Sequence, residues 1–155
     1  MEIEEVKKTI RLPEGEDFKL LSDIFTFQEE SYEYIVLRSV NDMIEELEDP
    51  HSGLSEEKRK EYNKIIEEHL EIVSNFVNLK KKINQEGKEI ELDDKDVSAF
   101  KITLEQQLWC AEERIEDFTE DRFGWGKENC SKLISQEKEI IRVIKELQSE
   151  LGTTD

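Results

Sequence analysis

Apolar side chains recur every three or four residues over residues 55–86, 94–122 and 128–151. This spacing places them along one face of an α-helix, so each stretch is predicted to be a long amphipathic helix. In the second stretch the apolar positions are Val97, Phe100, Leu104, Leu108, Ala111, Ile115 and Phe118. Asp93 or Asp94 stands where this helix would begin, and aspartate is a favoured N-cap residue.

The first third of the chain is less regular. Apolar residues grouped after Asp17 indicate one helical segment, and a second apolar run, Ile35–Leu47, is clearly helical and stops at Pro50. Ser31 is a candidate break between them, so the segment is either one bent helix or two. We prefer a single bent helix.

Residues 1–12 and 88–92 alternate apolar and polar side chains, which is the period of a β-strand. They are predicted to pair as a small two-stranded ribbon that rests on the helices, because isolated ribbons are marginally stable. With short turns between the long helices, the prediction is an all-α fold: an antiparallel up-and-down bundle of about four long helices with this ribbon. Residues 1–155 are expected to form a single acidic helical-bundle domain.

The chain is strongly acidic, with 40 Asp and Glu residues against 22 Lys and Arg and a net charge of −18. Residues 1–50 are the most acidic part. Such a field repels phosphate backbones and anionic lipids, so we expect no direct binding of nucleic acid and no membrane binding. No apolar run approaches the length of a membrane span and no secretory signal is evident, which predicts a cytoplasmic protein.

Two surfaces are candidates for binding a basic partner protein. Acidic residues recur on the outward faces of the first third, at Glu29, Glu30, Glu33, Glu45, Glu46 and Glu48. At the turn over residues 123–127, Arg122, Phe123 and Trp125 are of types enriched at binding hot spots. The alternative for these aromatic residues is that they fold back and cover the end of the bundle.

A carboxylate pattern offers a different interpretation. The spacing Glu67-Glu68-x-x-Glu71, followed by Glu91-x-x-Asp94, resembles the metal-binding motifs of the MazG-like nucleotide pyrophosphohydrolases. The resemblance implies an all-helical, Mg²⁺-dependent enzyme in which these five carboxylates hold the metal. The spacing Glu-Glu-x-x-Glu also occurs at Glu29 and at Glu112, as expected in a chain this rich in acids. We therefore favour solvated helix faces, and expect no metal and no cofactor.

The preferred hypothesis is a non-enzymatic acidic module that binds and inhibits a basic partner, such as a nuclease or a nucleic-acid-binding protein. Small immunity proteins, antitoxins and phage-encoded inhibitors have this general character, and some present the charge of a nucleic acid. The alternatives are the pyrophosphohydrolase and a structural or oligomerising bundle. Heptad-like apolar steps in residues 62–83 and 128–151 favour the last of these.

Overall fold

The computed structural model describes residues 7–152. The described chain is mostly helical, with one small antiparallel sheet. Its elements, in chain order, are β1 (Lys8–Arg11), α1 (Glu16–Ser31), the π-helix η1 (Tyr32–Leu37), α2 (Arg38–Glu48), α3 (Glu56–Lys82), β2 (Glu89–Leu92), α4 (Asp94–Thr119) and α5 (Lys127–Leu151). The predicted helical bundle with a β ribbon is confirmed. No helix within residues 7–152 is both long enough and apolar enough to cross a membrane.

The helices α3 and α4 begin at side-chain caps. The Ser55 hydroxyl oxygen accepts a hydrogen bond from the Lys58 N–H at 3.1 Å. At the start of α4, the Asp96 N–H donates to the Asp93 carboxylate at 2.8 Å, and the Asp93 N–H donates to Asp96 at 3.1 Å. This reciprocal pair is a capping box. The bond from the Asp96 N–H also holds the pKa of Asp93 below its usual value.

Residues 16–48 form one continuous helical segment, and Ser31 keeps right-handed helical geometry. The preferred single helix over the first third is therefore present, without a break at Ser31. The irregularity lies just after it, because η1 has π-helical hydrogen bonding. The helix ends at Glu48, since Pro50 cannot continue it.

The β ribbon forms where the alternating pattern predicts it. β1 and β2 are antiparallel, with Ile10 opposite Ile90 and Lys8 opposite Leu92. Ile10, Ile90 and Leu92 are all buried and belong to the main core. The ribbon is thus stabilised by the helices beneath it. The part of the predicted first strand in residues 1–6 lies outside the described residues.

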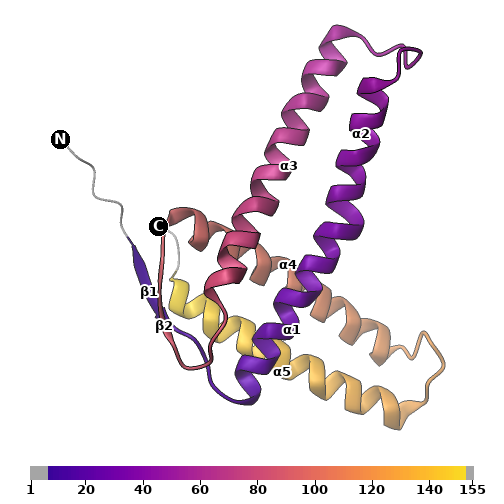
Figure 1. The fold of residues 1–155 in the computed structure, drawn as a ribbon. Coiled ribbons are helices and arrows are strands. Elements are labelled where there is room, and N and C mark those ends of the chain that lie inside the picture. The colour runs from indigo at the N-terminus through magenta and orange to yellow at the C-terminus, as the bar shows by residue number, and fades with distance from the viewer. Residues whose placement is uncertain (1–6, 153–155) are drawn as a thin grey trace.

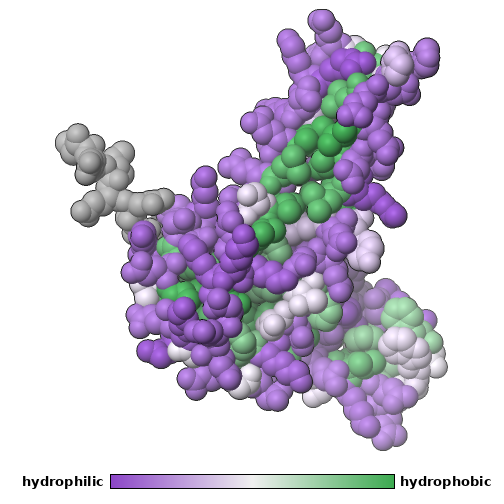
Figure 2. Space-filling view, in the orientation of Figure 1, coloured by the Kyte–Doolittle hydropathy of each residue, from purple (hydrophilic) through white to green (hydrophobic). Residues whose placement is uncertain are grey.

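The helices form two antiparallel hairpins that cross, as Figure 1 shows. One hairpin is α1, η1 and α2 paired with α3, and the other is α4 paired with α5. The second hairpin crosses the first near its base, while α2 and the N-terminal half of α3 project beyond it (Figure 1). Apolar surface runs along this projecting part in Figure 2. The two hairpins therefore pack against each other only at the crossing, and the projecting part has no third helix of the described chain against it.

An aromatic cluster occupies the crossing of the two hairpins. Phe25 of α1 stacks on Phe76 of α3 with ring centroids 5.5 Å apart, and Phe100 of α4 meets Phe25 edge-on at 5.5 Å. Tyr32 meets Phe76 edge-on at 5.1 Å. All four side chains are buried. Aromatic pairs in these geometries add to the stabilisation that burial alone provides.

Buried glutamines join α1 to α4 beside this cluster. The Gln107 side-chain amide donates to the Gln28 carbonyl oxygen at 2.8 Å, and the Gln28 amide donates to Gln106 at 2.5 Å. Gln28 and Gln107 are almost inaccessible to solvent. Because an unpaired buried amide is costly, these bonds favour one register of α1 against α4.

The aromatic cluster predicts a large cost for truncating its central ring. Phe76→Ala removes a buried side chain that contacts two other rings, so the free energy of unfolding should fall by about 3–5 kcal/mol. Ile72→Ala, on the same helix with 37% of the side chain exposed, should lower it by less than about 1 kcal/mol. Urea denaturation followed by circular dichroism measures both. Equal losses for the two variants would contradict the assigned core.

Candidate functional site

In the π-helical segment η1, the apolar side chain of Ile35 points away from the core. Positions 28, 32 and 35 follow the spacing of one α-helical face, so Ile35 would join buried Gln28 and Tyr32 if the helix were regular. Instead, Ile35 is 68% exposed. A π-helix bonds residue i to i+5 and therefore turns less per residue, so Ile35 stops short of the core face. Such segments occur frequently at functional sites.

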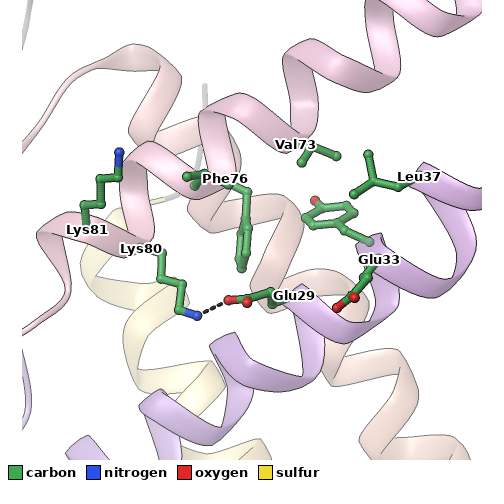
Figure 3. Close-up of a pocket in the computed structure, with 9 residues that line it drawn as sticks. Glu29, Glu33, Leu37, Val73, Phe76, Lys80 and Lys81 are labelled. Carbon is green, nitrogen blue, oxygen red and sulfur yellow. Dashed lines mark hydrogen bonds and ion pairs between the residues drawn. The ribbon is translucent and has the colours of Figure 1, made fainter. Parts of the chain in front are cut away.

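A groove lies on each side of this segment. The first, which we call the hairpin groove, lies between α1–η1 and α3 and has a volume of about 570 Å³. It is lined by Glu29, Tyr32, Glu33, Leu37, Val73, Phe76, Val77, Lys80 and Lys81 (Figure 3). Its floor is aromatic, and an ion pair between Lys80 and Glu29 spans one end.

The second groove, which we call the tryptophan groove, lies between η1 and α4 and has a volume of about 620 Å³. Its lining is Gln28, Ser31, Tyr32, Ile35, Val36, Ile102, Glu105, Gln106, Gln107, Trp109 and Cys110. Trp109 is 64% exposed, and Ile35 on η1, which lines the same groove, is 68% exposed. Exposed large side chains concentrated beside a groove are typical of binding surfaces.

Carboxylates surround Trp109 on the surface of α4. Glu105 precedes it by four residues, and Glu112 and Glu113 follow it by three and four. Residues at these spacings are neighbours on a helix, and all three glutamates are exposed. The indole face is itself attractive to cations. The tryptophan groove therefore combines apolar contact area with a strongly negative rim.

Tyr32 forms part of both grooves. Its ring packs on Phe76 on the hairpin side and lines the tryptophan groove on the other. Burial raises the pKa of its hydroxyl, and the nearby Gln28 side chain acts in the opposite direction. The hydroxyl oxygen lacks a hydrogen-bond partner of good geometry within the described chain.

The six predicted acidic binding residues fall into two separate groups. Glu29 and Glu33 line the hairpin groove and Glu30 is exposed beside them. The others, Glu45, Glu46 and Glu48, are exposed near the end of α2, where Glu46 accepts a hydrogen bond from the Tyr62 hydroxyl at 3.3 Å. At the helical rise the two groups are about 20 Å apart. They do not form one continuous acidic site.

The predicted residues of the α4–α5 turn pack together but stay accessible. Phe123 stacks on Trp125 with centroids 4.8 Å apart, and Trp125 lies 6.0 Å from Phe118. Phe123 is 57% and Trp125 50% exposed, so the rings cover the end of the hairpin only in part. Arg122 is paired with Asp117 and Glu120, which already compensate its charge.

Asp121 organises this turn. It has a positive φ of 46°, and its carboxylate accepts hydrogen bonds from the Cys130 thiol at 3.3 Å and the Trp125 N–H at 2.8 Å. The bond from Cys130 and the backbone N–H bonds lower the pKa of Asp121. Burial, with the neighbouring carboxylate, raises the pKa of the Cys130 thiol and makes it a poor nucleophile. Cys110 and Cys130 are both free cysteines.

The five carboxylates of the pyrophosphohydrolase interpretation are all exposed. Glu67, Glu68 and Glu71 lie midway along α3, whereas Glu91 lies on β2, 3.9 Å from Lys7, and Asp94 begins α4. Within residues 7–152, no three Asp, Glu, His or Cys side chains are grouped closely enough to hold a metal ion. The structure does not bring these five carboxylates together.

Sequence reasoning missed the principal residues of the tryptophan groove. Trp109 had a usable signal, because it falls outside the apolar stripe that contains Leu104, Leu108 and Ala111. A tryptophan off the buried face of a helix is an exposed tryptophan. Ile35 had no such signal, since its exposure follows from the π-helical segment.

Comparison with protein-family models, curated proteins and solved structures gave no match.

The turn predicts a pH-dependent contribution to stability. The pKa of Asp121 is lower in the folded state than in the unfolded chain, so its contribution is complete above about pH 5 and is lost as the pH falls through the folded-state value. Asp121→Asn keeps a residue type that tolerates positive φ but removes the charge. The melting temperature of this variant should be lower at pH 7, and its difference from the wild type should shrink below about pH 4. A difference that is constant with pH would contradict this role.

Proposed function

We propose that the protein is a non-enzymatic binding module that captures a basic partner protein through the tryptophan groove. The observation that carries this proposal is the position of Trp109, 64% exposed in an apolar groove and bordered by Glu105, Glu112 and Glu113. Tryptophan is the residue type most typical of binding hot spots. The carboxylates around it select a partner with the opposite charge.

A basic amphipathic helix fits the chemistry of this groove best. Its apolar face would cover Ile35 and Trp109, and its Lys or Arg side chains would meet the glutamates or lie over the indole ring. The net charge of −18 adds long-range attraction that accelerates the encounter. Attraction by surface charge acts mainly on the association rate, and the buried apolar contacts act mainly on dissociation.

Capture inhibits the partner protein if the captured surface is the one that the partner uses to bind nucleic acid. A basic patch that holds phosphates is attracted by the same negative field that this module presents. While the module occupies that patch, the nucleic acid is excluded. The charge and the groove support a mode of action like that of immunity, antitoxin and phage-inhibitor proteins.

A defined peptide tests the chemistry of the groove. The chain has two tryptophans, so Trp125→Phe leaves Trp109 as the single tryptophan reporter. Titration with a helical peptide that has one leucine face and one lysine face should change the emission of Trp109, with affinity that falls as salt rises from about 50 to 500 mM. The same peptide with glutamate in place of lysine should not bind. Equal binding of both peptides would show that the rim has no role.

The natural partner provides the second test. Tagged wild-type protein purified from its host should retain a basic protein, and Trp109→Ala should weaken that complex by more than about tenfold, as at a hot spot. Trp125→Ala is the matched control, because this side chain is similarly exposed but lies at the α4–α5 turn. Loss of the partner with Trp125→Ala alone would instead assign binding to Arg122, Phe123 and Trp125.

A further inference from the structure

The projecting part of the first hairpin leaves a long apolar stripe uncovered. Val40 is the one buried residue of α2, while Leu70 and Val77 of α3 are 44% and 43% exposed. Figure 2 shows this stripe as a continuous apolar band along the hairpin. A contiguous apolar band is typical of an interaction surface.

The stripe extends the hairpin groove toward the tip of the hairpin. On α3, Ile66, Leu70, Val73 and Val77 recur at steps of four, three and four, so they form one row, and the last two line the groove. On the other helix, Leu37 lines the groove and Ile44 follows it by seven residues on the same face. Leu70 and Val77 are exposed, and the other apolar members of the two rows are half-buried.

Both rows end in charged residues, and the two rows have opposite signs. The α3 row runs from Arg59 to Lys81 at helical steps of seven, four, three, four and four. The row on the other helix has Glu33 at the base and Glu48 near the tip. One edge of the stripe is therefore basic at both ends and the other edge is acidic at both ends.

We propose that a second copy of the chain covers this stripe, so that two hairpins form a four-helix bundle. A two-fold axis along the groove places the α3 row of each copy on the opposite row of its partner, which brings Lys81 toward Glu33 and Arg59 toward Glu48. Every helix then has antiparallel neighbours, because α3 and α2 run in opposite directions. The surface is complementary to itself in charge, as a two-fold interface requires.

The size of the stripe is adequate for a dimer. The α3 row from Arg59 to Lys81 is about 33 Å long at the helical rise, and two adjacent helices are about 20 Å wide. The resulting area of about 650 Å² per copy is close to the roughly 800 Å² per partner of a standard interface. The tryptophan groove lies on the other side of η1, so this dimer does not rest on the proposed function.

Light scattering of the full chain during size-exclusion chromatography tests the proposal. At about 100 μM, a dimer with a Kd near 1 μM is almost fully formed. Leu70→Glu should give a monomer of unchanged helicity by circular dichroism. Ile72→Glu is the matched control, because Ile72 is 37% exposed on the same helix but points about 200° away from Leu70. It should leave the dimer intact.

A charge exchange tests the arrangement of the two copies. Lys81→Glu and Glu33→Lys should each weaken the homodimer, because each places like charges on facing rows. An equimolar mixture of these two variants should restore a heterodimer, since position 81 of each copy then faces the opposite charge at position 33 of the other. Both native side chains are exposed, so neither change should affect the fold.

A monomeric wild type at this concentration would overturn the proposal, as would a dimer that survives Leu70→Glu. A mixture that fails to restore the dimer would overturn the two-fold arrangement. If Trp109→Ala abolished the dimer, the interface would belong to the tryptophan groove and not to the stripe. Failure of partner capture with an intact dimer would reject only the proposed function.

Discussion

The contact between the two helical hairpins determines most of what the rest of the molecule can do. Phe25, Phe76 and Phe100 come from three different helices and meet at the crossing. Since this contact lies near one end of the first hairpin, α2 and the N-terminal half of α3 project without further support (Figure 1). The same crossing creates the surfaces on either side of η1. The position of the crossing thus determines both where the stabilising core forms and which apolar side chains stay exposed.

The π-helical segment sets the chemistry of these surfaces. A regular helix would direct Ile35 inward. The altered turn instead exposes Ile35, which lines the same groove as Trp109, while Tyr32 remains in the core. This segment of six residues contributes lining residues to both grooves, and Tyr32 is common to the two.

Much of the fold could be predicted from the sequence, because its causes are local. The caps at Ser55 and Asp93 and the alternation of residues 88–92 depend on neighbouring residues, and these elements form where the pattern indicates. The crossing of the hairpins could not be predicted, since it depends on contacts such as that between Phe25 and Phe100. The candidate site was predicted less well for the same reason. Its acidic residues are evident in the composition, but the exposure of Ile35 depends on hydrogen bonding that no local pattern reveals.

The place of Tyr32 in both grooves has a thermodynamic consequence. Tyr32 lines both grooves, so a ligand that displaced its ring in one groove would change the shape of the other. The free energies of binding at the two surfaces are then coupled, and linkage requires that the coupling be equal in both directions. A partner that favours the paired form of the chain must itself bind that form more tightly. Through the buried ring of Tyr32, self-association of the chain would alter the affinity for the partner, and binding of the partner would alter self-association.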